Sequence, residues 1–190
     1  MRTAGWLMAL PFVVAGCDLR GGQIGLVGPA PLPGPPAPLV GTPAPPFALL
    51  DQEDRPVTPG KLHGRWVVLY FFPPDDAPAC ACQANQFTAM LKRFGDMDAA
   101  VLGINGEASA MHRYLIAKYG LPMPLLSDPN HAVAQRYGAW RDSPDPGGHV
   151  VRSALLVDPA GIIRSHWPNI TSTDDLALIR RRIEELRRQR

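Results

Sequence analysis

The chain has 190 residues, of which 46% are hydrophobic and 19% charged, and its formal net charge at pH 7 is +2. This length and composition allow one globular domain with a further segment attached. The small net charge and the lack of interleaved aromatic and basic residues argue against a nucleic-acid partner. The sequence also contains no glycine-rich loop of the kind that cradles phosphates.

Residues 1–16 have the character of a secretory signal peptide. Arg2 is the only charge before a short apolar run, Trp6 to Val14, which is too short to span a membrane. The run closes on Val14-Ala15-Gly16-Cys17, which resembles the bacterial lipobox, in which the cysteine is lipidated and becomes the first mature residue. We therefore expect Cys17 to carry acyl chains that anchor the protein to the extracytoplasmic side of a bacterial membrane. The alternative is simple secretion, with Cys17 just past the cleavage site.

Residues 17–40 are predicted to form a linker. From Gly28 to Pro46 nearly every second residue is proline, and such a composition cannot build a packed core. Polyproline II is the expected conformation, so about twenty residues at ~3.1 Å each would hold a domain up to about 60 Å from its anchor. A ligand for an aromatic groove is the other use of such a segment.

Residues 41–190 alternate between strand and helix patterns. Runs of apolar residues predict strands at Phe47–Leu50, Trp66–Phe72, Ala99–Ile104, Ser153–Val157 and Ile162–Trp167. Helical spacing predicts helices over Cys80–Gly95, Met111–Gly120 and Asn130–Tyr137 and from Ser172 onward, with Gly95 and Gly120 as C-terminal caps. The last two strands flank Asp158-Pro159-Ala160-Gly161, which is typical of a type I turn. The pattern predicts an α/β fold, with helices on both faces of a central sheet.

Cys80 is the candidate reactive residue. The strand ending at Phe72 is apolar throughout, so we expect it to be buried on both faces, and Pro73 and Pro74 end it. Helical spacing then places Cys80 in the first turn of the next helix. The unpaired amides and the positive end of the helix dipole favour a thiolate there, which lowers the pKa of the thiol.

Several segments occur in a characteristic order and spacing. They are Gly41–Leu49, Leu62–Pro73, Lys118–Pro129, Ala134–Trp140 and Arg152–Asp158. Together they resemble the peroxiredoxins, most closely the peroxiredoxin Q or bacterioferritin comigratory protein group. The resemblance covers nearly all of the chain after the linker and implies a thioredoxin-like fold with a central mixed β-sheet. It also implies a thiol peroxidase that needs no cofactor and no metal.

The resemblance implies a role for three residues. Cys80 matches the attacking cysteine, whose thiolate cleaves the peroxide O–O bond and becomes a sulfenic acid. Arg152 matches the arginine whose fixed charge stabilises the thiolate and the departing oxygen. Pro73 matches the first residue of the motif Pro-x-x-x-Thr-x-x-Cys. The expected partners are a peroxide and an external thiol reductant, thioredoxin-like or other. A solvated surface arginine is the alternative reading of Arg152.

The chain departs from the family pattern at two positions. Ala77 replaces the motif threonine, whose hydroxyl is expected to touch thiolate and peroxide, and this replacement predicts a slow enzyme. Asn85 stands where many members have a resolving cysteine. Cys82 is the possible resolving thiol, although a Cys80–Cys82 disulfide would require the first helical turn to unwind. The alternative interpretation of Cys82 is a small buried hydrophobic residue without a redox role.

The sequence predicts an antioxidant enzyme that reduces hydrogen peroxide or small organic hydroperoxides outside the cytoplasm. A degenerate family member without catalysis is the first alternative, because of Ala77. A thiol-disulfide oxidoreductase would normally have Cys-x-x-Cys, and Cys80-Ala81-Cys82 is one residue shorter. A copper-handling protein could use both thiols. The histidines give that reading no support, because no two have paired ligand spacing: His63, His112, His131, His149 and His166.

Overall fold

The structure is a computed structural model that describes residues 40–74, 81–142 and 148–189, with backbone only at 81–87 and 173. In chain order its strands are β1 (Leu49–Leu50), β2 (Pro56–Val57), β3 (Trp66–Phe71), β4 (Ala99–Asn105), β5 (Leu125–Ser127), β6 (Trp140–Arg141), β7 (His149–Val150), β8 (Ser153–Val157) and β9 (Ile163–Trp167). Its helices are the 3-10 helix η1 (Pro59–Leu62) and the α-helices α1 (Ala81–Gly95), α2 (Ser109–Tyr119), α3 (Ala132–Arg136) and α4 (Thr173–Arg188).

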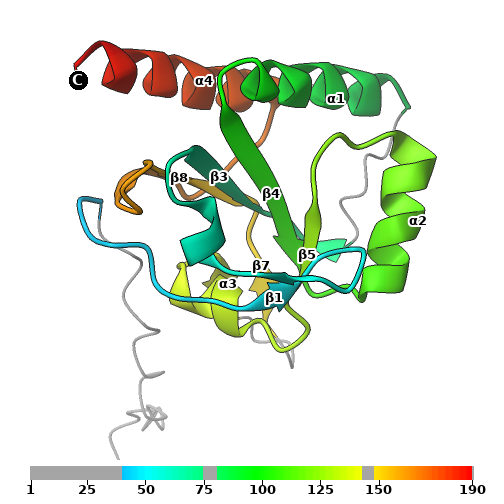
Figure 1. Ribbon diagram of the computed structural model, residues 1–190. Helices are drawn as coiled ribbons and strands as arrows, with labels where there is room; N and C mark the ends of the chain where they lie inside the picture. The colour runs from blue at the N-terminus through cyan, green and yellow to red at the C-terminus, as the bar shows by residue number, and fades with distance from the viewer. Residues whose placement is uncertain (1–39, 75–80, 143–147, 190) are drawn as a thin grey trace, which may run out of the picture. The chain divides into compact units, whose positions relative to one another are not determined.

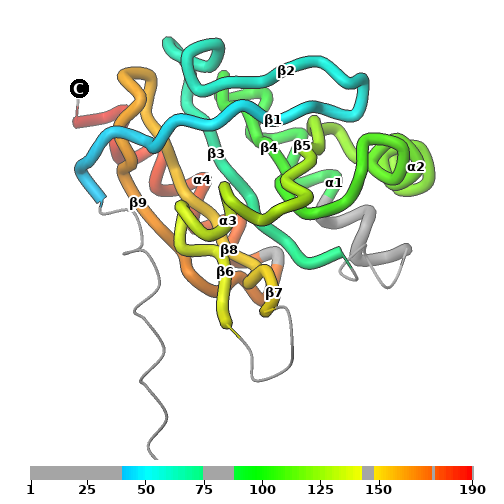
Figure 2. Tube along the Cα trace, turned by 90° about the horizontal axis from the view of Figure 1, so that it is seen from below, coloured from blue at the N-terminus to red at the C-terminus, as the bar shows by residue number. Residues whose placement is uncertain are grey.

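The centre of the fold is a seven-stranded mixed sheet in the order β2-β1-β5-β4-β3-β8-β9. The three strands β3, β4 and β5 are parallel to one another. The flanking strands are antiparallel to their neighbours, and β8 and β9 form the predicted hairpin. In the turn, the Gly161 N–H donates to the Asp158 carbonyl at 2.8 Å, as a type I turn requires. Figure 2 shows β6 and β7 apart from this sheet, as a separate pair.

Strand β3 is buried on both faces, as its continuous apolar sequence predicts. Side chains alternate along a strand, so the even-numbered residues Trp66, Val68 and Tyr70 enter one core cluster and the odd-numbered residues enter the other. The first cluster also contains Phe94 of α1, Leu115 of α2 and Ile179 of α4. The second contains Val133 and Ala134 of α3. Helices therefore cover both faces, which confirms the predicted α/β architecture (Figure 1).

Local sequence signals explain where several of the helices begin and end. Gly120 follows α2 in the left-handed conformation, with φ of 61°, and its N–H donates to the Ile116 carbonyl, as predicted. The Asp175 carboxylate accepts hydrogen bonds from the N–H groups of Thr171 and Ser172 before α4. Helix α1 ends at Gly95, the predicted position, but Gly95 itself is not in the left-handed conformation. Asp98 has that conformation instead, with φ of 49°.

The elements that sequence patterns miss are short. Strands β2, β6 and β7 have two residues each and β5 has three, so none shows a periodicity. Strand β5 is added to the sheet by pairing with β4, in the register Gly103–Leu125. Among the residues that the structure describes, no helix has both the length and the apolar character needed to cross a lipid bilayer.

A segment that we call the strap, residues 41–44, pairs with the beginning of β9. The Gly41 N–H donates to the Ile163 carbonyl at 2.7 Å, and the Ile163 N–H donates to Thr42 at 2.9 Å. The Ala44 N–H donates to Gly161 at 2.9 Å. Because Val67 at the start of β3 pairs with Val157 at the end of β8, the strap lies near the amino-terminal end of β3.

Candidate active site

Pro73 and Arg152 lie at the same end of the sheet. Strands β3 and β8 are antiparallel, and Phe71 at the end of β3 is paired with Ser153 at the start of β8. Pro73 is half-buried and follows β3 closely, while Arg152 is half-buried and directly precedes β8. The sheet therefore brings together the two described residues that the family motif selects, although they are far apart in the chain.

The backbone of Arg152 is held where β8 begins. Ala154 and Leu156 belong to the core cluster that α1 and α4 cover. Arg152 lies outside β8, directly before its first residue Ser153. Its carbonyl accepts a hydrogen bond from the Ile170 N–H at 2.9 Å, which fixes this backbone against the segment before α4.

The cysteines can be placed only in part. Cys80 and Ala77 lie outside the described residues, as does Cys17 with the predicted signal peptide and most of the linker. The backbone of Cys82 is in the first turn of α1. That turn contains no acidic residue, so no carboxylate there opposes the positive end of the helix dipole. The described part of α1 begins at Ala81, the residue after Cys80 in the sequence.

A polar network that the sequence did not predict lies at the end of β4. Asn105 is buried, and its Oδ1 accepts hydrogen bonds from the Glu107 N–H at 3.0 Å and from His112 Nε2 at 2.6 Å. Ser127 Oγ donates to the Glu107 carbonyl at 2.7 Å. These bonds fix the turn between β4 and α2. Burial lowers the pKa of His112 from 6.5 to about 4, so its imidazole is neutral at physiological pH.

A second unpredicted cluster lies at the start of α3. The buried Asp128 carboxylate accepts hydrogen bonds from the N–H groups of Val133 at 3.3 Å and Ala134 at 2.8 Å. The His131 ring is stacked on Trp140, with a centroid distance of 4.5 Å. The polar Asn105 at the end of the apolar run of β4 is the signal that could have indicated the first cluster.

The histidines that the structure describes lie apart from one another in role and surroundings. Within residues 40–74, 81–142 and 148–189, no three side chains of His, Cys, Asp or Glu gather in an arrangement that could hold a metal ion. His112 is part of the core network, and His63 is exposed beside a pocket.

The fold is the thioredoxin-like fold of several solved peroxiredoxins. PrxQ of Xylella fastidiosa superposes with a TM-score of 0.68 at 21% identity, over 80% of this chain and 96% of that one. Peroxidoxin BcpB of Mycobacterium tuberculosis gives a TM-score of 0.66 at 26% identity, over 80% of this chain and 97% of that one. The predicted thioredoxin-like fold is thereby confirmed.

The AhpC/TSA family matches residues 40–166, and the chain belongs to this family. Chloroplastic peroxiredoxin Q of Sedum lineare is 37% identical over 126 residues, which are 65% of this chain and 66% of that protein. A putative peroxiredoxin bcp of Coxiella burnetii is 32% identical over 127 residues, which are 65% of this chain and 84% of that protein. The predicted resemblance to the peroxiredoxin Q and Bcp group is confirmed. The chain spans 56% to 66% of the length of the plant proteins.

Proposed function

We propose that the protein is a thiol peroxidase in which Cys80 is the nucleophile and Arg152 supports it electrostatically. The substrates are hydrogen peroxide or small organic hydroperoxides, and the electrons come from an external thiol reductant. The observation that carries this proposal is the Phe71–Ser153 pairing. This pairing places Arg152 at the end of the sheet where Pro73 follows β3, and Pro73 precedes Cys80 in the sequence. The chain also belongs to the AhpC/TSA family.

The proposed reaction begins with the ionised thiol. The sulfur attacks one peroxide oxygen, an S–O bond forms, and the O–O bond breaks. The electron pair leaves on the other oxygen, which takes up a proton and departs as water or as an alcohol. The Arg152 guanidinium would stabilise the negative charge before and after the transfer, because it stays protonated at any physiological pH. Backbone N–H groups at the start of α1 would add to this stabilisation.

The sulfenic acid on Cys80 must then be reduced by a second thiol. A thiol condenses with it to give a disulfide and water, and a further thiol pair restores the cysteine. Cys82 is one candidate for the second thiol. Since Cys82 is in the first helical turn, a Cys80–Cys82 disulfide requires this turn to open. Direct reduction by the external thiol avoids that requirement, and we favour it.

The proposal includes an extracytoplasmic setting. The apolar run closing on Val14-Ala15-Gly16-Cys17 supports a lipid anchor on Cys17, and the proline-rich residues after it support a spacer. Mass spectrometry of the protein from bacterial membranes tests this part. An acylated Cys17 at the mature amino terminus is the expected result, and an unmodified or retained leader would contradict it.

A single-turnover experiment tests the chemistry. The reduced protein is treated with one equivalent of hydrogen peroxide, and Cys80 and Cys82 are followed by mass spectrometry with a dione probe for sulfenic acid. A trapped sulfenic acid on Cys80 supports the proposal, and the loss of two hydrogen atoms indicates the Cys80–Cys82 disulfide. Cys80→Ser should remove the reaction, and Cys82→Ser serves as the matched control. A rate no faster than that of free cysteine would favour the non-catalytic alternative.

A further inference from the structure

Asn105, the last residue of β4, lies beside the point where the chain leaves β3. The two strands are parallel, and the Phe72 N–H donates to the Ile104 carbonyl at 3.3 Å. The residues that come next along the two strands are Pro73 and Asn105. Asn105 is therefore at the end of the sheet where Pro73 lies.

The side chain of Asn105 projects to the sheet face that α2 covers. Gly103 precedes Asn105 by two positions in β4, and a Cβ added at Gly103 would be 3.1 Å from side-chain atoms of Phe72 and Met123. Phe72 and Met123 belong to the core cluster that α1, α2 and α4 share. Because side chains alternate along a strand, Asn105 is on this face too, and its bond to His112 of α2 agrees with this.

Only one side of the Asn105 amide is used. The residue is 1% exposed, and Oδ1 accepts hydrogen bonds from the Glu107 N–H and from His112 Nε2. These two bonds fix which way the amide faces. Nδ2 is buried and has no hydrogen-bond partner among the residues that the structure describes. A buried donor without an acceptor is unfavourable, so this group requires an explanation.

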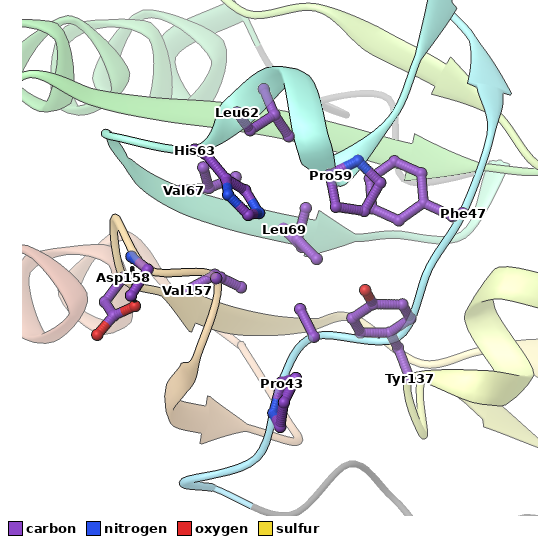
Figure 3. Close-up of a pocket in the computed structure, with 13 residues that line it drawn as sticks. Pro43, Phe47, Pro59, Leu62, His63, Val67, Leu69, Tyr137, Val157 and Asp158 are labelled. Carbon is purple, nitrogen blue, oxygen red and sulfur yellow. Dashed lines mark hydrogen bonds between the residues drawn. The ribbon is translucent and has the colours of Figure 1, made fainter.

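The opposite end of β3 offers a contrast (Figure 3). Val67 and Leu69 belong there with Tyr137 to the second core cluster. The Tyr137 hydroxyl donates to the Pro45 carbonyl at 2.5 Å, so this buried polar group is paired within the protein. The Asn105 Nδ2 group at the other end has no such pairing.

The backbone that follows Phe72 supplies acceptors and no donors. Pro73 and Pro74 have no N–H group, so this stretch cannot extend the ladder of the sheet with donors of its own. Its carbonyl oxygens need donors from elsewhere. A buried water molecule can join a side-chain donor to a carbonyl over a gap that is too long for a direct bond.

We propose that Asn105 is a positioning residue of the peroxidase site, whose Nδ2 group binds the Pro73 carbonyl through one water molecule. The inference rests on the proposed function, because Pro73 begins the segment that leads to Cys80. By holding the Pro73 peptide, Asn105 sets the direction in which this segment leaves β3, and thereby the position of the thiolate relative to Arg152. His112 acts through Asn105, because its Nε2–H group holds Oδ1 and so orients Nδ2.

Stopped-flow oxidation of Cys80 in the full chain tests the effect on the reaction. Asn105→Ala should lower the rate of peroxide reduction by about ten- to a hundredfold, because a small displacement of a reacting group is costly. It should also raise the thiol pKa of Cys80, which iodoacetamide alkylation reports. Asn105→Ser keeps a hydroxyl that can both accept and donate, and it should recover most of the rate.

Asp128→Ala is the matched control. It also removes a buried polar side chain that binds backbone N–H groups at the end of a parallel strand, but its partners belong to α3 and the second core cluster. It should leave both the rate and the thiol pKa of Cys80 unchanged, although it destabilises the protein. Equal slowing by Asp128→Ala would mean that the Asn105 effect is general destabilisation, and it would overturn the inference.

NMR of the intact protein tests the hydrogen bond without depending on activity. The Nδ2 protons of Asn105 should show a nuclear Overhauser contact to a long-lived water molecule, and Asn105→Ala should shift the carbonyl carbon signal of Pro73. A native protein that reacts no faster than free cysteine refutes the proposed function, and the NMR contacts then still decide whether Asn105 binds this backbone. The absence of a water contact at Nδ2, or an alanine variant as fast as an active native protein, would overturn the inference.

Discussion

His112 Nε2 lies 2.6 Å from Oδ1 of Asn105 in the protein interior. The same oxygen accepts a hydrogen bond from the Glu107 N–H, and this bond fixes the orientation of the amide. Nε2 must therefore be the donor, so the neutral imidazole carries its proton on Nε2 and has no proton on Nδ1. The second proton, on Nδ1, would be added in a buried environment, which explains why the pKa of His112 falls to about 4.

Acid should destabilise the protein through His112. In the folded state the imidazole protonates near its pKa of about 4, whereas the unfolded chain takes up the proton near 6.5. The neutral form contributes stability above about pH 6.5, and this contribution is lost as the pH falls toward 4, by about 3 kcal/mol in total. Urea unfolding of the native protein and of His112→Gln between pH 7 and pH 4 measures this loss of stability. The variant should lose less stability on acidification, and an unchanged pH slope would contradict the prediction.

Gly103→Ala should destabilise the sheet. A Cβ at Gly103 would be 2.5 Å from Cδ2 of Leu125 and 3.1 Å from Cε1 of Phe72. Leu125 is fully buried, so the neighbours cannot move easily, and overpacking should cost about 1–3 kcal/mol. Thermal unfolding measures this cost. Gly95→Ala is the control, because nothing lies within 4 Å of its added Cβ and it ends a helix. The control should be neutral or slightly stabilising.

Asp128→Ala should destabilise the start of α3. The carboxylate accepts hydrogen bonds from the Val133 and Ala134 N–H groups, and its loss leaves two buried donors unpaired, at about 1–3 kcal/mol. Hydrogen exchange at these two amides should become faster. Asp142→Ala, at an exposed position, should leave both rates as they are. Unchanged exchange in the Asp128 variant would show that α3 does not depend on this carboxylate.

Ala77→Thr should raise the rate of peroxide reduction by about ten- to a hundredfold. The family motif has threonine at this position, and a hydrogen bond to a charged group contributes about 1.5–3 kcal/mol. Stopped-flow measurement of Cys80 oxidation checks this. Ala77→Val has a similar shape without the hydroxyl and should give no gain. A threonine variant as slow as the valine variant would mean that the rest of the proposed site is not assembled.

Arg152→Met should lower the rate of peroxide reduction by about ten- to a hundredfold, because a charge-assisted interaction with the Cys80 thiolate would be lost. It should also raise the thiol pKa of Cys80, which the pH dependence of alkylation by iodoacetamide reports. Arg93→Met, at an exposed position near the end of α1, is the control and should change neither quantity. A methionine variant with the native rate and thiol pKa would remove Arg152 from the mechanism.

The sequence predicted the parts of the fold that carry strong local patterns. The uninterrupted apolar run of β3, the hairpin around Asp158-Pro159-Ala160-Gly161 and the stripe of α4 are all present. Strand β5 was missed because its three residues become a strand only through pairing with β4. The Asn105–His112 bond was missed for a related reason. It joins a strand to a helix, and no spacing rule predicts which polar groups meet when those elements pack.

The hydrogen bonds of the strap fix the point at which the described chain enters the domain. The chain joins the sheet beside Ile163, whereas β3 carries it roughly 20 Å away over its six residues, toward Pro73. The strap and Pro73 therefore lie at opposite ends of β3.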